Sequence, residues 1–242
     1  MSYATHDVKI VPEGDGVDVK RLFPLNGFMN FDPFVLWDHF EISPGRGFPD
    51  HPHRGFEAIT YMFKGGMNHK DNLGNESFVT AGGAQRFTAG KGIVHSEMPA
   101  ENGNSNGIQL WINLPQKLKK IDPSYQQVND ADFPVKDIKG GKLKVLVGEG
   151  SPLILNTQVS YLHINLEEQA EYSISFDKSM RGIIYLMKGE LNVDSNTLKQ
   201  DQALFIEEQE NIHIIAHDKS EFMLCIGLPH NEPIHQYGPF VD

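Results

Sequence analysis

Short apolar runs bounded by glycine, proline, asparagine and aspartate recur from one end of the chain to the other, whereas helical periodicity is scarce. Most of these runs contain β-branched or aromatic residues, which favour strands. Many short strands separated by turn signals are typical of an all-β sandwich or barrel, so we predict an all-β fold. The runs on which this prediction depends are residues 35–37, 58–63, 108–112, 143–147, 161–166, 183–187 and 222–226.

An internal repeat indicates that the chain contains two copies of one β module. Residues 60–65 and 184–189 match in tyrosine, lysine and glycine at one offset. Further along, His95 is echoed by His213 at a slightly shorter offset, which a difference in loop length explains. Repeated segments of this kind are the mark of a duplicated structural unit.

The stretch 115–141 separates the two copies and differs from them in composition. It is polar, punctuated by proline and glycine, and poor in apolar periodicity, so we expect a connector there. A chain of 242 residues is long enough for two compact domains, each with its own core. We therefore predict an N-terminal domain over 1–130 and a C-terminal domain over 131–242.

Charge and cysteine content exclude several classes of protein. The chain has 21 basic and 32 acidic side chains and a formal net charge of −11, so we expect no direct binding to nucleic acid. Its single cysteine, Cys225, lies in an apolar run, which predicts a buried thiol and excludes an intrachain disulfide. Because we find no export signal and no apolar stretch of about 18 residues, we expect a cytoplasmic protein that does not enter a membrane.

Two short segments combine histidine with acidic residues in a way that suits a metal ion. His51 and His53 are two residues apart, as are His95 and Glu97. Because successive side chains of a strand alternate between its faces, each pair points to one side. If the two strands are neighbours, three imidazoles and one carboxylate converge inside a barrel. A lone HxH motif can also be a surface pair in a proline-rich loop, but the second pair and the glycines before each pair favour a metal site.

Three neutral nitrogens and one oxygen suit a divalent transition metal better than Ca²⁺ or Mg²⁺, which prefer oxygen ligands. Fe(II) is our first candidate, and Ni, Mn, Co, Cu and Zn are alternatives, because this ligand set accommodates several ions. Four protein ligands leave two positions open on an octahedral ion. Open positions indicate chemistry rather than structural support.

The metal-site segments resemble known motifs. Residues 45–57 resemble the first motif of cupins, in which a glycine precedes HxH and a glutamate follows it, and 92–95 resemble the Gly-x-x-His of the second. Lys64 stands where the first cupin motif has a glycine, and Gly90 where the second has a proline. More narrowly, the sequence resembles the pirin family. The pirin-like segments are residues 32–34, 48–57, 90–99 and 236–241.

The resemblance implies a bicupin, with two tandem cupin barrels of the double-stranded β-helix or jelly-roll type. It implies that the N-terminal barrel holds the metal through His51, His53, His95 and Glu97. Glu57 also shares a face with His53 and is the ligand in many cupins, but the pirin pattern uses the glutamate that matches Glu97, and we predict Glu97.

The second domain is predicted to be metal-free. The offset between the two repeats places Ser175, Asp177 and Arg181 at the positions of the first-domain residues 51, 53 and 57. Only His213 retains a histidine, and one histidine beside a serine and an aspartate is a poor transition-metal site.

Two functions from different classes follow. Several bacterial pirins act as quercetin 2,3-dioxygenases, so the resemblance implies an enzyme that cleaves quercetin or a related flavonol or enolic substrate with O2. Glu97 would accept the proton of the substrate hydroxyl. The resemblance also implies an alternative, because eukaryotic pirins are iron-dependent nuclear co-regulators: an iron-dependent regulatory protein that acts through a protein partner without turnover. In either case we expect a monomer.

Other side chains have weaker signals. Four aromatic residues are candidates for the walls of an apolar substrate pocket, although core packing explains them equally well. These are Phe48, Phe56, Phe63 and Trp111. His69 lies in the turn-like segment 65–71, so we expect it in solvent.

Overall fold

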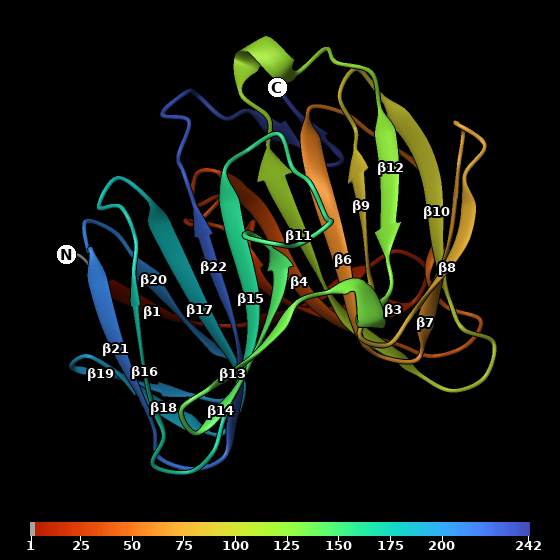
Figure 1. Ribbon diagram of the computed structural model, residues 1–242. Coiled ribbons are helices and arrows are strands. Elements are labelled where there is room, and N and C mark those ends of the chain that lie inside the picture. The colour runs from red at the N-terminus through yellow and green to blue at the C-terminus, as the bar shows by residue number, and fades with distance from the viewer. Residues whose placement is uncertain (1–2) are drawn as a thin grey trace. The chain divides into compact units, whose positions relative to one another are not determined.

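The computed structural model describes residues 3–242 and is built almost entirely of β-strands (Figure 1). The described chain forms two compact units, which we call the first and the second barrel. The first barrel comprises Lys9–Asp132, Leu155–Thr157 and His230–Asp242. The second comprises residues 3–8, Phe133–Ile154 and Gln158–Pro229. The predicted all-β fold is confirmed.

The first barrel combines two antiparallel sheets. Its seven-stranded sheet has the order β12 (Ser124–Val128), β9 (Ala84–Thr88), β6 (Phe56–Lys64), β11 (Ser105–Asn113), β4 (Phe34–Ile42), β3 (Val17–Phe23) and β2 (Lys9–Glu13). Its four-stranded sheet has the order β5 (Phe48–His53), β10 (Ile93–Pro99), β7 (Gly66–Asp71) and β8 (Glu76–Thr80).

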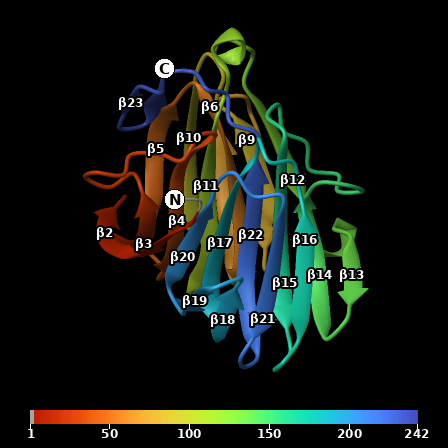
Figure 2. The same ribbon diagram turned by 90° about the vertical axis from the view of Figure 1, so that its left-hand side faces the viewer.

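The second barrel repeats this plan. Its seven-stranded sheet has the order β1 (Tyr3–Asp7), β20 (Gln202–Ile206), β17 (Arg181–Lys188), β22 (Ser220–Gly227), β15 (Val159–Leu166), β14 (Gly141–Val147) and β13 (Val135–Ile138). Its four-stranded sheet has the order β16 (Glu171–Ser175), β21 (Asn211–Ala216), β18 (Glu190–Val193) and β19 (Asn196–Lys199). Figure 2 shows several strands of the larger sheet side by side, from β20 to β13. Six strands of the larger sheet and all four of the smaller sheet repeat the strand order of the first barrel, and only the edge strands β12 and β1 differ in their place along the chain. The two units are therefore copies of one module.

Strand register corrects the alignment of the two copies. In the first barrel His95 pairs with His51, whereas in the second His213 pairs with Ser173. Ser173 is therefore the counterpart of His51, whereas the sequence offset gave that position to Ser175, two residues too far along. The link from β16 to β17 is longer than the link from β5 to β6, and this difference accounts for the shift.

The structure divides the chain after Asp132, near residues 130 and 131, where the boundary was predicted. The two ends of the chain, however, each belong to the barrel that was not predicted for them. Residues 3–8 belong to the second barrel, where β1 pairs with β20, and His230–Asp242 belongs to the first. The expected connector 115–141 is not an extended linker. It contributes β12 to the first barrel and β13 to the second, together with two short 3-10 turns.

Alternation along β10 determines which side chains enter the first barrel. Ile93, His95, Glu97 and Pro99 are buried, while Val94 between them is 40% exposed. This is the period of two expected for a strand with one face on the core. The apolar members of the inner face hold the strand in place, and the two polar members are thereby held inside the barrel.

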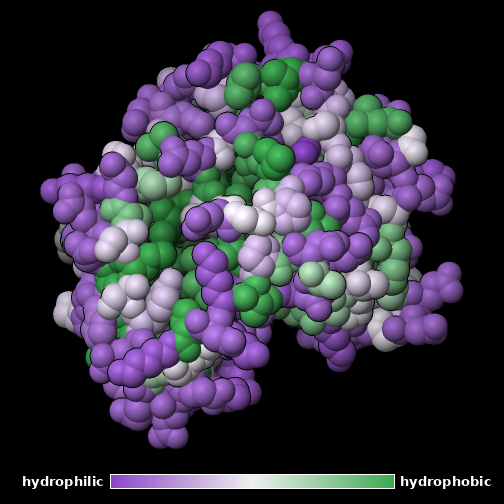
Figure 3. Space-filling view, in the orientation of Figure 1, coloured by the Kyte–Doolittle hydropathy of each residue, from purple (hydrophilic) through white to green (hydrophobic). Residues whose placement is uncertain are grey.

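None of the helices within residues 3–242 is long and apolar enough to cross a membrane. The face of the molecule seen in Figure 3 is largely hydrophilic and carries several patches of hydrophobic residues.

Candidate metal centre

The two segments that carry the histidine motifs are neighbouring strands. β5 and β10 pair antiparallel, with His95 opposite His51 and Ile93 opposite His53. The register shifts between His95 and Glu97, so Glu97 stands opposite Phe48. The structure therefore meets the condition on which convergence of the two motifs depends.

Three histidines converge on one point. The ligand nitrogens of His51, His53 and His95 all lie within 4.8 Å of one another, and no other such group of histidine, cysteine or acidic residues occurs in the described chain. Nε2 of His51 and Nε2 of His95 are 3.1 Å apart. Two nitrogens bound at right angles to an ion about 2.1 Å away stand about 3.0 Å from each other. The spacing therefore fits two adjacent ligands of one metal ion.

Backbone carbonyls select the tautomer of two of these rings. Nδ1 of His51 lies 2.7 Å from the carbonyl oxygen of Pro49, and Nδ1 of His53 lies 3.2 Å from that of Pro239. A carbonyl oxygen only accepts hydrogen bonds, so each Nδ1 carries the proton. The Nε2 lone pairs are then left for a metal.

Burial keeps two of the rings neutral. Burial, together with the neighbouring His95 and His51, lowers the pKa of His53 to about 3. Burial also lowers the pKa of His95 well below its usual value, together with the nearby His51 and His69. Because only a neutral imidazole binds a metal, these environments favour ligation.

Glu97 lies beside the histidines but outside the group that they form. It is 2% exposed, and its carboxylate accepts hydrogen bonds from Thr60 (2.8 Å), Gln85 (2.5 Å) and Gln109 (2.6 Å). The Trp111 indole in turn donates to Gln109 over 3.0 Å. All three donors are neutral, so the negative charge of Glu97 is held in place without a cationic partner among them. Such a buried anion favours a nearby cation.

Glu57, the alternative ligand, is engaged elsewhere. It is fully buried, and one carboxylate oxygen accepts hydrogen bonds from the Thr88 hydroxyl (2.7 Å) and the Asn156 side-chain amide (2.8 Å). The other oxygen accepts from the backbone N–H of Asn156 over 2.8 Å. Glu57 therefore fastens the returning segment Leu155–Thr157 to the first barrel.

His69 is a buried neighbour of the site that the sequence prediction placed in solvent. It is 1% exposed on β7, and its Nε2 lies 3.0 Å from a carboxylate oxygen of Asp71. Its ring stacks on Tyr125 with centroids 4.2 Å apart and lies 5.4 Å from the ring of His95. The prediction was wrong because β7 is a strand of the four-stranded sheet, beside β10, and not a turn. The signal that could have revealed it is the alternation of Met67, His69 and Asp71.

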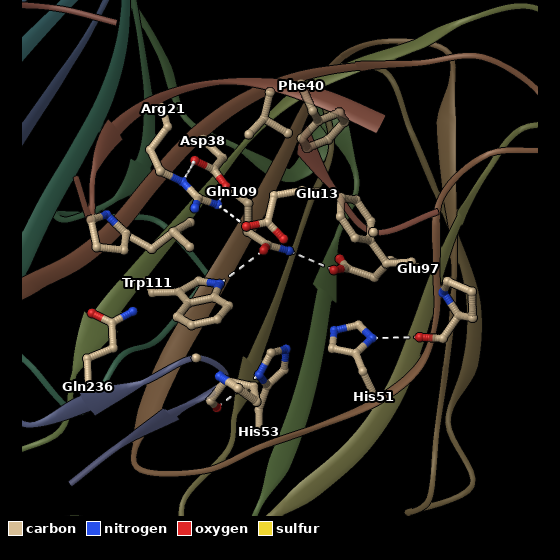
Figure 4. A pocket seen from close by; sticks show the side chains of 18 of the residues that line it. Glu13, Arg21, Asp38, Phe40, His51, His53, Glu97, Gln109, Trp111 and Gln236 are labelled. Carbon is tan, nitrogen blue, oxygen red and sulfur yellow. Dashed lines mark hydrogen bonds and ion pairs between the residues drawn. The ribbon is translucent and has the colours of Figure 1, made fainter. Parts of the chain in front are cut away.

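A cavity of about 500 Å³ opens onto the histidines (Figure 4). His51, His53 and Glu97 line one part of it, and Trp111 and Phe48 contribute aromatic surface. The other two aromatic candidates do not line it. Phe56 stacks on the far side of Trp111 at 4.1 Å, and Phe63 packs against His39 at 5.8 Å.

A charged cluster lines the cavity away from the histidines (Figure 4). Arg21 donates to both carboxylate oxygens of Asp38, over 2.8 and 2.6 Å, and to Glu13 over 2.7 Å. Burial raises the pKa of Asp38 to about 6, against the lowering effect of Arg21. The cavity is thus lined by His51, His53 and Glu97 in one part and by this charged cluster in another.

Comparison with known proteins agrees with the fold. The pirin family model matches residues 16–112, and the model of the pirin C-terminal cupin domain matches 161–242. A pirin-like protein of Solanum lycopersicum is 39% identical over 238 residues, covering 95% of this chain and 82% of the relative. Human pirin is 34% identical over 240 residues, covering 95% of this chain and 83% of its own.

Solved structures give the same result. A quercetin 2,3-dioxygenase from Acinetobacter baumannii superposes with a TM-score of 0.91 at 28% identity, covering 98% of this chain and 90% of the other. The bacterial pirin YhhW of Escherichia coli, in complex with nickel(II), superposes with a TM-score of 0.80 at 25% identity, covering 94% and 99%. The chain therefore belongs to the pirin family, and its two barrels are cupin domains.

Proposed function

We propose that this protein is a metal-dependent dioxygenase that cleaves quercetin or a related flavonol or enolic compound with O2. The observation that carries the proposal is the convergence of three histidine nitrogens, all within 4.8 Å of one another, at a cavity of about 500 Å³ that has aromatic walls and is lined by two of the three, His51 and His53. Similarity to a structure described as a quercetin 2,3-dioxygenase supports the choice of substrate class.

His51, His53 and His95 would hold the metal, with Glu97 as the fourth ligand. A bound divalent transition metal would supply Lewis acidity toward a substrate oxygen and redox access to O2. Fe(II) remains our first candidate. Among the alternatives Ni, Mn, Co, Cu and Zn, nickel has the support of the nickel(II) complex of the similar bacterial pirin.

The chain's own residues would handle the substrate and its proton. The hydroxyl of a flavonol is acidic and must be deprotonated before the ring becomes electron-rich. Glu97 would take that proton, and in support its oxygen bonded to Gln109 has only this one hydrogen bond among the described contacts. Trp111 and Phe48 would cover the faces of a flat aromatic substrate and keep water away from it.

A turnover assay tests the proposal. Protein loaded separately with Fe(II), Mn(II) or Ni(II) is mixed with quercetin under air, and the loss of flavonol absorbance is followed. We expect turnover by the wild type and by a His213→Ala control, which alters the corresponding position of the second barrel. We expect none by a His51→Ala/His53→Ala variant. Equal rates in the wild type and the double variant with every metal would refute the proposed activity.

The same preparations separate the alternative function. Tight metal binding without turnover of flavonols or other enediols would favour a metal-dependent binding protein. Retrieval of one protein partner by the metal-loaded wild type, and not by the double variant, would support that reading.

A further inference from the structure

We propose that residues 236–242, which we call the clasp segment, form a working part of the metal centre. In this inference the Pro239 carbonyl positions the ligand His53, and an ion pair between Arg54 and Asp242 keeps that carbonyl in place. The inference rests on the metal site assigned under the proposed function. It concerns how the site is built, and it does not depend on which substrate is turned over.

The orientation of His53 depends on ring contacts and on one hydrogen bond. Its ring stacks on Phe87 with an interplanar angle of 7° and meets Trp111 edge-on at 73°. These contacts fix the plane of the ring but do not determine which nitrogen is protonated. The hydrogen bond from Nδ1 to the Pro239 carbonyl does so, because it assigns the proton to Nδ1 and leaves the Nε2 lone pair for the metal. Carbonyls behind metal-binding histidines act in this way in many metal sites.

The clasp segment reaches the site from far along the chain. It contains the short strands β23 (Gln236–Tyr237) and β24 (Phe240–Val241), and Figure 2 shows β23 beside β5. The backbone N–H of Val241 donates to the carbonyl of Arg54 over 3.1 Å. The residue that follows the ligand His53 is thus bonded directly to the clasp segment.

Side chains fasten this contact. Arg54 binds both carboxylate oxygens of Asp242, over 2.9 and 2.6 Å, and its guanidinium lies 4.6 Å above the ring of Phe240. Lys119 donates to the carbonyls of Gly55 (2.9 Å) and Val241 (2.8 Å) and so joins the two segments.

Gly55 shows how closely the two segments approach. Its φ is +85°, and a Cβ at this position would lie 1.8 Å from the carbonyl oxygen of Val241. Only glycine permits this contact. Because the packing is close, a shift of the segment that carries His53 would move Pro239, and a shift of the clasp segment would move His53.

The clasp segment also forms part of the cavity wall. Gln236, Gly238 and Pro239 line the same cavity as His51 and His53. Displacing the segment should therefore change both the environment of the metal and the space beside it.

Metal binding tests the inference without any turnover assay. The main variant is Arg54→Ala/Asp242→Ala, which removes an exposed ion pair and should leave the fold intact. The matched control is Arg181→Ala/Glu207→Ala, which removes an arginine–glutamate pair of the second barrel. A chain that ends at His235 removes the whole clasp segment. Circular dichroism and thermal unfolding establish that each variant is folded.

We measure the dissociation constants of Ni(II) and Co(II) and the visible absorption spectrum of the Co(II) form. We expect the ion-pair variant to bind both metals about 10-fold more weakly, within the range seen for loss of outer hydrogen bonds. The shortened chain should show a larger loss and an altered Co(II) spectrum. The control should match the wild type. In the Zn(II) form, nitrogen NMR should show His53 protonated at Nδ1 in the wild type, and that signal should shift in the ion-pair variant.

The inference is overturned if every folded test variant, the ion-pair variant and the shortened chain, binds both metals within twofold of the wild type and has an unchanged Co(II) spectrum. If the shortened chain does not fold, the ion-pair variant alone decides. Wild type that binds metal but does not turn over flavonol would refute the proposed activity and leave the inference intact. Wild type that binds none of these metals would refute both.

Discussion

Replacing Glu57 by glutamine tests whether its carboxylate stabilises the first barrel or binds the metal. Glu57 is the ligand expected from the general cupin motif, yet the structure directs both of its oxygens to Thr88 and Asn156. We expect Glu57→Gln to lower the stability of the first barrel and to leave its metal content unchanged. Glu97→Gln should instead lower the metal content.

The expected loss of stability can be worked from the three hydrogen bonds. Glutamine keeps one acceptor oxygen, so its amide NH2 faces a buried donor, the backbone N–H of Asn156, when the oxygen retains the other two bonds. An unsatisfied buried donor costs about 1–3 kcal/mol. The two retained bonds become neutral, and each weakens by about 1 kcal/mol. Relief from burying a charge offsets part of this sum, which leaves a loss of about 3 kcal/mol. For a chain of this size that lowers Tm by about 6–12 °C.

Thermal unfolding followed by circular dichroism measures the stability, and elemental analysis of the purified protein measures metal per chain. Glu149→Gln is the control, since its side chain is 94% exposed and should alter neither quantity. The reasoning is refuted if Glu57→Gln loses its metal while keeping the Tm of the wild type, because Glu57 would then be a ligand and not a fastener.

Three further outcomes follow from the buried groups. Burial lowers the pKa of His53 to about 3, so below about pH 6.5 the unfolded chain binds a proton that the metal-free folded state does not. The Tm of the metal-free protein should therefore fall as the pH is lowered from about 6.5 toward 3. The fall should be less steep in His53→Gln. Burial raises the pKa of the fully buried Cys225 thiol, so a thiol reagent should label it only after unfolding, and rapid labelling of native protein would contradict its place in the core. Arg21→Met should lower the unfolding free energy by about 3–5 kcal/mol, because it leaves Asp38 buried without its partner, and Arg21→Met/Asp38→Asn should recover part of that loss in denaturant titrations.

At the candidate metal centre, the predictions about which way side chains point were correct where they depended on alternation within one strand. His51 and His53 each lie at the site on β5, and His95 and Glu97 lie inside the barrel on β10, because a period of two is a local property of the backbone. The same rule applied to β7 would have placed His69 inside. The glycines at 65 and 66 suggested a turn, and the strand that follows them was missed.

The sequence by itself determined the all-β class, the duplication, the family and the two motifs that supply the histidines, since each depends on residue type and spacing along a short segment. The tertiary structure decided which residues act on those motifs from a distance. Asn156 donates a hydrogen bond to Glu57 from 99 positions along the chain, and the carbonyl of Pro239 pairs with Nδ1 of His53 from 186 positions along the chain. Such contacts are fixed by strand pairing and by the return of the chain to the first barrel. No local pattern records them, because the energy that selects them comes from packing of the whole barrel.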